Sequence, residues 1–242
     1  MEEIIGITAL REAAISKFER ALASRFPSEK AKEWVRQNSL PYRELMTYYH
    51  CALMEVETKF KVLDEDFAIR ENMNPIESIK TRIKSPESIV EKMIRNEFPL
   101  TVKSIEENLN DIAGIRVICS FESDIYKLAD ALLRQDDVIL LREKDYIKRP
   151  KENGYRSLHL IIATPIFLHD EKRMMKVEVQ LRTLAMDVWA SLEHKIRYKK
   201  SIEDEAAMET VSEKLQICAQ MSAELDRQMQ LAKEAATGEN IG

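Results

Sequence analysis

Hydrophobic residues in the first 70 positions recur at steps of three and four, the spacing that places side chains on one face of a helix. The residues that share this face are Leu45, Tyr49, Ala52, Val56, Phe60 and Leu63. Pro41 precedes them and suits the first turn of a helix, where no backbone N–H is needed. The pattern therefore predicts that the amino-terminal part of the chain is helical.

After residue 75 the period changes to two, as expected of strands. Residues 78–85 alternate in this way, and four further segments are predicted strands: residues 112–121, 138–146, 156–167 and 175–183. The polar residues 168–174 separate the last two, which we expect to form a hairpin. Helical patterns at residues 85–98 and 123–135 lie between the strands, so the sequence predicts a mixed α/β sheet with helices packed on it.

The helix at residues 85–98 has clear signals at its start and on its inner face. Ser85 is a suitable N-cap and Pro86 a suitable first helical residue. Ile89, Met93 and Ile94 are the expected contacts with the core.

Two more helices are expected near the end of the chain, the first at residues 184–200. The second carries a heptad-like seam. Its members are Met208, Val211, Leu215, Cys218, Ser222, Leu225 and Met229. Such a seam packs either on the chain's own core or against another subunit, and the pattern alone leaves both open.

Composition narrows the function classes. The 242 residues are 45% hydrophobic and 33% charged, with a net charge of −5, which argues against a surface built to coat nucleic acid or an anionic membrane. Cys51, Cys119 and Cys218 have unrelated spacings, so we expect no disulfide framework or metal motif. Neither a signal peptide nor a membrane-spanning apolar run is evident, and we expect a cytoplasmic location.

Cations gather around one strand and the helix that follows it. Lys80, Arg82 and Lys84 alternate along the strand and so project to one face, and Lys92 and Arg95 are neighbours on the helix. The three strand cations have no carboxylate among them. The set of cations is either a solvated surface or the binding site of a polyphosphate.

Two carboxylates are candidates for a Mg²⁺ site, which in proteins typically uses one or two carboxylates plus substrate phosphates. Glu178 stands on the polar face of a strand, opposite buried valines, and could equally be an exposed residue in an ion pair. Asp111 either precedes the strand at 112–121 or shares it through a bulge at Gly114. Arg116, within that apolar strand, must be paired or stacked.

The stretch "KENGYRSLHL" at residues 151–160 begins with a basic turn and continues into an apolar strand. Tyr155, Ser157 and His159 alternate along it and should share a face. An aromatic ring above basic residues suits a nucleobase, since stacking contributes about 1–3 kcal/mol per base. The alternative is a tyrosine at the edge of the core.

These motifs occur together in an order that resembles the synthetase domain of the RelA/SpoT family, and more specifically a small alarmone synthetase. The segments that carry the resemblance are "RIKSPESIVEKMIR", "DIAGIRV", "REKDYIKRPKENGYRSLH", "VEVQLRT" and "WASLEHKIRYK". The resemblance implies a nucleotidyltransferase-like α/β (α+β) fold with a roughly five-stranded mixed sheet. It also implies amino-terminal helices at 1–74, a catalytic core at 75–200 and an oligomerisation helix at 201–242.

The family transfers the pyrophosphoryl group of ATP to the 3′-hydroxyl of GDP or GTP and releases AMP. Carried over by position, the residues expected to bind ATP are Arg82, Lys84, Lys92, Arg95 and Arg116. Asp111 and Glu178 would bind Mg²⁺, and Glu178 would also accept the proton of the attacking hydroxyl. Tyr155 would stack on guanine. The other residues expected to contact the acceptor nucleotide are Lys144, Lys151, Asn153 and His159.

The resemblance also implies a homo-oligomer, with a tetramer favoured, and control by expression, assembly, an alarmone or single-stranded RNA. The only His-Asp pair in sequence, His169-Asp170, falls in the polar turn, so we expect no alarmone hydrolase activity. The alternatives are a module that binds single-stranded RNA, a catalytically inactive homologue, and a nucleotidyltransferase that attacks the α-phosphorus and releases pyrophosphate.

Overall fold

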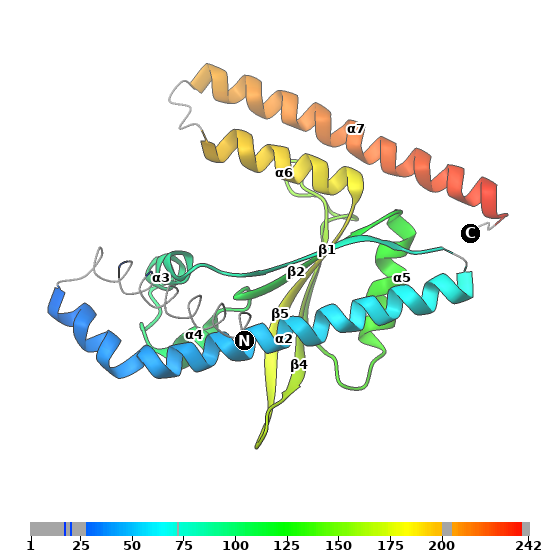
Figure 1. The fold of residues 1–242 in the computed structure, drawn as a ribbon. Helices are drawn as coiled ribbons and strands as arrows, with labels where there is room; N and C mark the ends of the chain where they lie inside the picture. Colours follow the sequence, from blue (N-terminus) through cyan, green and yellow to red (C-terminus); the bar gives the residue numbers. More distant parts are fainter. Residues whose placement is uncertain (1–16, 18–19, 21–27, 72, 200–204, 239–242) are drawn as a thin grey trace, which may run out of the picture. The chain divides into compact units, whose positions relative to one another are not determined.

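The computed structural model describes residues 17, 20, 28–71, 73–199 and 205–238. Its helices are α2 (Ser28–Glu71), α3 (Pro86–Arg95), α4 (Val102–Asn108), α5 (Glu122–Leu133), α6 (Leu184–Lys199) and α7 (Glu205–Thr237). Its strands are β1 (Ile76–Ile83), β2 (Ala113–Cys119), β3 (Ile139–Asp145), β4 (Leu158–Phe167) and β5 (Lys172–Thr183) (Figure 1).

All five predicted strands are present, and they form one sheet in the order β1-β2-β5-β4-β3. The predicted hairpin joins β4 to β5 through a turn in which the Leu168 N–H donates to the Glu171 carbonyl at 2.8 Å. Burial along the inner half of β5 alternates with period two, as the sequence indicates. The predicted fold, a sheet of five strands with helices, is therefore confirmed.

By compactness the chain divides into two units that interleave in sequence, and each is described by itself. The first unit contains Met1–Val56, Thr81–Gly114 and Ala163–Glu178. The second contains Glu57–Lys80, Ile115–Ile162 and Val179–Gly242. The predicted boundaries near residues 74 and 200 follow the order of the chain instead, and they stay a prediction.

Helix α2 buries the face that the spacing predicts. Its fully buried members are Leu45, Tyr49, Ala52, Val56 and Phe60, each at most 2% exposed. The prediction for Pro41 was wrong, because α2 begins at Ser28 and Pro41 lies inside it. A proline within a helix removes one backbone hydrogen bond and bends the helix, and Figure 1 shows α2 bent in its blue, amino-terminal part.

Helix α3 begins as predicted, with the Ser85 hydroxyl accepting from the Ser88 N–H at 3.3 Å. Ile89 and Met93 are fully buried, but Ile94 is 36% exposed, so its predicted core contact was wrong. Val90 is buried instead. At 100° per residue, Ile94 lies well away from the stripe that Ile89 and Met93 define. The short helix α4, capped by Thr101, had no apolar period long enough to reveal it.

In the second unit, α6 and α7 lie side by side (Figure 1). A cluster of buried side chains joins them: Trp189 and Ala190 of α6 with Leu215 and Ala219 of α7. The Trp189 indole donates to the Leu215 carbonyl at 2.9 Å, so the ring satisfies its polar group within the cluster. Of the predicted seam on α7, Val211 and Leu215 therefore pack on the chain's own core, whereas Cys218 is exposed.

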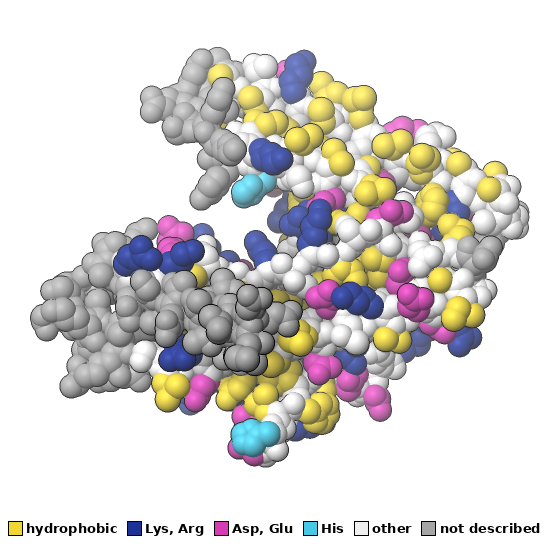
Figure 2. Space-filling model, in the orientation of Figure 1, with side chains coloured by type: hydrophobic (Ala, Val, Ile, Leu, Met, Phe, Trp, Pro, Cys, Tyr) yellow, Lys and Arg dark blue, Asp and Glu magenta, His cyan; other side chains and the backbone are white. Residues whose placement is uncertain are grey.

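The second half of α7 forms two buried salt bridges with the rest of its unit. Asp226 accepts from Arg156 at 2.9 Å, and Lys233 pairs with Asp124 at 2.6 Å, both pairs largely buried. Four apolar residues spaced by four, the α7 stripe, stay exposed: Ile217, Met221, Leu225 and Met229. Figure 2 shows yellow side chains along this part of the surface. The predicted seam is thus only half used within the chain.

Cys51, Cys119 and Cys218 are all free thiols. None of the helices in the described part of the chain is both long enough and apolar enough to cross a membrane.

Candidate functional site

A lysine–aspartate cluster, formed by Lys84, Lys92 and Asp111, lies in the first unit. Asp111 Oδ2 accepts from Lys84 at 3.0 Å and from Lys92 at 2.8 Å. Burial by itself raises the pKa of the Asp111 carboxyl, but the hydrogen bonds and charges of Lys92 and Lys84 outweigh it and hold the pKa below its usual range. Asp111 is therefore ionised at neutral pH.

Local geometry brings the three residues together. Lys84 directly follows β1, and its N–H donates to the Ile112 carbonyl at 2.8 Å. Lys92 stands in the last turn of α3. Strand β2 begins at Ala113, so Asp111 precedes the strand, and the alternative of a bulge at Gly114 is not needed.

The second oxygen of the same carboxylate is the unusual feature. Asp111 Oδ1 is buried and has no hydrogen-bond partner among the described residues. A buried anionic oxygen is costly unless a donor or a cation satisfies it. No group of three or more His, Cys, Asp or Glu residues in the described ranges could hold a metal on its own. The unpartnered oxygen of Asp111 fits a Mg²⁺ ion that takes its remaining ligands from substrate phosphates.

The cations around β1 are not the unpaired row that the sequence suggested. Lys80 pairs with Asp187 at 3.3 Å and Lys84 pairs with Asp111, so this interpretation was wrong for both. Strand alternation does not reveal carboxylates that arrive from distant parts of the chain. Arg82 is exposed, and its side chain passes over Gly114, where an added Cβ would lie 3.4 Å from Arg82 Nε. Arg95 is exposed in the last turn of α3.

Glu178 lies on the half-buried face of β5, as predicted, with Val177 and Val179 fully buried on the other face. Lys176 shares the face of Glu178 and donates to the Glu107 carbonyl at 2.9 Å. Burial lowers the pKa of Lys176. The carboxylate thus stands at a structured position of the sheet, and its role in metal binding and proton transfer stays a prediction.

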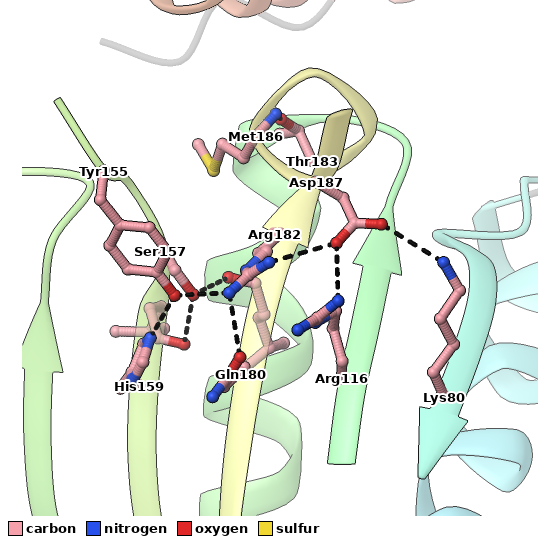
Figure 3. A network of polar contacts seen from close by, with 12 residues as sticks. Lys80, Arg116, Tyr155, Ser157, His159, Gln180, Arg182, Thr183, Met186 and Asp187 are labelled. Atoms are coloured by element: carbon pink, nitrogen blue, oxygen red, sulfur yellow. Dashed lines mark hydrogen bonds and ion pairs between the residues drawn. The ribbon is translucent and has the colours of Figure 1, made fainter. Parts of the chain in front are cut away.

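A tyrosine cluster in the second unit contains Tyr146, Lys151, Tyr155 and His159. The Tyr155 hydroxyl is 2.8 Å from His159 Nε2, and the Lys151 ammonium lies 4.8 Å from the centre of the Tyr155 ring. Tyr146 meets the Tyr155 ring edge-on at 6.0 Å. The Tyr155 ring is therefore held by polar and aromatic neighbours, of which Figure 3 shows His159 and Arg182. Its role as a platform for a nucleobase stays a prediction.

The loop before β4 holds the tyrosine in place. Asn153 Oδ1 accepts from the Tyr155 N–H at 3.2 Å, and Asn153 Nδ2 lies 3.4 Å from Glu193 Oε1. Gly154 has a φ of 86°, a conformation that favours glycine. Ser157 is fully buried and donates to the Leu181 carbonyl at 3.1 Å. Lys144 is exposed on β3.

The Asp187 network comprises Lys80, Arg116, Arg182 and Asp187, all in the second unit (Figure 3). Asp187 Oδ1 accepts from Arg116 and from Arg182, each at 3.2 Å, while Oδ2 accepts from Lys80 at 3.3 Å. Arg116 is thus paired, as an arginine in an apolar strand requires. Sequence reasoning missed Asp187, because an acid in a first helical turn is ordinarily explained by the helix dipole.

Comparisons with known proteins show which family the chain resembles. Residues 81–203 match the model of a region found in RelA/SpoT proteins. The GTP pyrophosphokinase YwaC of Bacillus subtilis is 42% identical over 188 residues, covering 78% of this chain and 88% of that protein.

Two solved structures share the fold. Small alarmone synthetase 2 from Bacillus subtilis superposes with a TM-score of 0.71 and 41% identity, covering 80% of this chain and 98% of the other. Small alarmone synthetase 1 from the same organism, bound to its product pppGpp, superposes with a TM-score of 0.69 and 34% identity. The match covers 84% of this chain and 98% of the other.

Proposed function

This chain belongs to the RelA/SpoT family, and from that premise we propose that it is a small alarmone synthetase. It transfers the pyrophosphoryl group of ATP to the 3′-hydroxyl of GDP or GTP and releases AMP. The observation that carries the proposal is Asp111, ionised between two lysines and with one buried oxygen unpartnered among the described residues. It lies within a segment that matches the family model.

Residues of the first unit bind the donor. Lys84 and Lys92 now share one carboxylate oxygen, and the ATP phosphates would compete with that oxygen for both ammonium groups. Arg82 and Arg95 are exposed and can contact the same nucleotide. Charge-assisted hydrogen bonds of this kind contribute about 1.5–3 kcal/mol each. Arg116 is also proposed to contact ATP.

Asp111 and Glu178 would hold Mg²⁺, with Asp111 offering its unpartnered oxygen. When bound, the ion supplies positive charge that lowers the cost of bringing two anionic nucleotides together and of the charge that develops on the phosphoryl oxygens. The protein's own contribution is to keep Asp111 ionised through Lys84 and Lys92.

The transfer itself needs little covalent chemistry from the protein. The 3′-oxygen of the guanine nucleotide attacks the β-phosphorus of ATP, and the bond between that phosphorus and the oxygen bridging to the α-phosphate breaks. AMP leaves with the electron pair of that bond. Glu178 accepts the hydroxyl proton, as a positioned carboxylate base does.

Residues of the second unit bind the acceptor. The Tyr155 ring stacks on guanine, and its hydroxyl is held by Arg182 at 2.6 Å and contacts His159 at 2.8 Å. Lys151 already lies over the ring and, being exposed, can move to the acceptor phosphates. Lys144, Asn153 and His159 complete the acceptor contacts.

Product identity tests the proposal. The protein is incubated with Mg²⁺, ATP and GDP or GTP, and the nucleotides are separated by ion-exchange chromatography. We expect equal amounts of AMP and a guanine nucleotide with two more phosphates. Release of pyrophosphate would instead show attack on the α-phosphorus, and the absence of any product would indicate an inactive homologue.

A further inference from the structure

Within the proposed function, Arg116 and Tyr155 serve different substrates, and the Asp187 network connects them. Asp187 Oδ1 accepts from Arg116 Nη1 and from Arg182 Nη1, both at 3.2 Å. The other terminal nitrogen of Arg182, Nη2, donates to the Tyr155 hydroxyl at 2.6 Å. A single arginine therefore separates the carboxylate from the acceptor ring, while the carboxylate contacts Arg116 directly (Figure 3).

Asp187 is itself held in a defined position. Strand β5 runs directly into α6, and the Thr183 hydroxyl accepts from the Met186 N–H at 3.2 Å, which caps the helix. Asp187 lies in the first turn, where the helix dipole favours a negative charge, and the residue is only 9% exposed. Lys80 holds its second oxygen at 3.3 Å.

Arg182 depends on this carboxylate. The arginine is 4% exposed, and among the residues that the structure describes its guanidinium forms a salt bridge only with Asp187. Its other acceptors are neutral: the Tyr155 hydroxyl at 2.6 Å and Gln180 Oε1 at 3.0 Å. The planar fork of arginine fits this three-way arrangement, which a lysine could not reproduce. Removing the charge of Asp187 would leave a buried cation with neutral acceptors alone.

We propose that Asp187 is a positioning residue for both substrates. It holds the Arg116 guanidinium for the donor directly, and it orients the Tyr155 ring for the acceptor through Arg182. The proposal rests on the proposed function, which gives Arg116 to ATP and Tyr155 to the guanine nucleotide. Asp187 acts through these two side chains.

A purely structural salt bridge makes a different prediction, and the chain contains a matched example. Asp124 pairs with Lys233 at 2.6 Å in the same unit, and the two side chains are 4% and 7% exposed. This pair joins α5 to α7 and contacts none of the residues proposed to bind nucleotide. Loss of its charge should lower the melting temperature and leave both KM values unchanged.

The test compares Asp187→Asn with Asp124→Asn by steady-state kinetics with ATP and GDP. The substitution keeps the shape of the side chain and removes its charge. We expect Asp187→Asn to raise the KM of both ATP and GDP about five-fold or more, the size expected when charged hydrogen bonds lose their partner. Asp124→Asn should leave both within about two-fold. Light scattering checks that both variants keep the wild-type mass.

A second variant tests whether Arg182 acts on the acceptor through the Tyr155 hydroxyl. Tyr155→Phe removes only the hydroxyl that Arg182 holds, so it should raise the KM of GDP and leave that of ATP unchanged. The proposal is overturned if Asp187→Asn lowers the melting temperature while both KM values stay at wild-type level, or if only one KM changes.

Equilibrium titration of wild type and Asp187→Asn with ATP and with GDP separates this inference from the proposed function. If wild type binds both nucleotides but forms no AMP, the proposed function fails, and weaker binding of both nucleotides to Asp187→Asn still supports the positioning role. If wild type forms AMP and the variant binds both nucleotides normally, the positioning role alone fails.

Discussion

The ion pairs of Asp111 should make the free energy of unfolding depend on pH. Hydrogen bonds and charge from Lys84 and Lys92 lower its pKa despite partial burial. An acid whose pKa is lower in the folded state adds stability above its unfolded pKa of about 3.9, and that stability is lost as the pH falls through the folded value. The contribution of Asp111 should therefore depend on pH.

We predict that Asp111→Asn lowers the free energy of unfolding by about 1–2 kcal/mol at pH 7 and that the difference shrinks as the pH falls below the unfolded pKa of about 3.9. Urea denaturation of both proteins across this range measures it. Asp66→Asn is the control, because Asp66 pairs with Arg70 on an exposed part of α2 and should have little effect. An equal deficit at pH 7 and pH 3 would show that the charge of Asp111 is not the cause.

Tyr155 carries the prediction for the acceptor. Tyr155→Ala removes a stacking surface, which is worth about 1–3 kcal/mol per base, and should raise the KM of GDP by roughly ten-fold or more. The KM of ATP should change far less. Steady-state kinetics with each substrate varied in turn measures both values, and equal effects on the two would argue against guanine stacking.

At the level of elements, the loop before β4 packs directly against α7. Gly154 has a φ of 86°, and a Cβ added there would clash with the Ala219 Cβ of α7. Arg156, two residues later, bonds to Asp226 of the same helix at 2.9 Å. The position of Tyr155 between these two contacts therefore depends on how α7 packs.

We predict that Gly154→Ala lowers the free energy of unfolding by about 2–4 kcal/mol, because it adds a clash to an unfavourable φ. Gly238→Ala is the matched control: its φ is 70°, but an added Cβ would meet nothing within 4 Å. It should cost only about 1 kcal/mol. Thermal unfolding measures both, and equal losses would mean that the contact with Ala219 is unimportant.

The elements themselves were largely predictable, because their apolar period depends on neighbours in sequence. Strand positions and the buried face of α2 follow from that period alone. The exceptions have local causes. Pro41 sits inside α2, where tertiary packing outweighs its usual preference, and α4 is too short to show a period. The second half of α7 buries Asp226 and Lys233 in place of the apolar seam.

The pairing within the candidate sites was much less predictable. Lys80 and Asp187 are 107 positions apart, and Lys84 and Asp111 are 27 apart, so no local pattern reveals either contact. Sequence could show that Arg116 needs a partner, since its strand is otherwise apolar. It could not show that the partner is Asp187, because that choice is made by the order of β1, β2 and β5 in the sheet.

At the scale of the whole molecule, the α7 stripe bears on the expectation of a homo-oligomer, which stays a prediction. The four apolar side chains of the stripe are spaced by four along the helix, and each is 41–67% exposed. An apolar surface of this kind is typical of a contact with another protein. We propose that a second copy of this chain covers it.

We predict that the double substitution Met221→Glu and Leu225→Glu lowers the mass in solution, because it places charge in the subunit contact. Light scattering measures the mass. The control adds the same charge at exposed polar positions of the same helix, Gln220→Glu with Gln228→Glu, and should keep the wild-type mass. An unchanged mass in the Met221 and Leu225 variant would reject the α7 stripe as the contact.

The central claim is that the two carboxylates at Asp111 and Glu178 support pyrophosphoryl transfer, and the rate of AMP formation by Glu178→Gln tests it most directly. Glu171→Gln, in the exposed turn between β4 and β5, is the control. With saturating Mg²⁺, ATP and GDP, we predict that Glu178→Gln forms AMP about a thousand-fold more slowly than wild type, while Glu171→Gln is unaffected. A Glu178→Gln protein that keeps most of the wild-type rate would contradict the account.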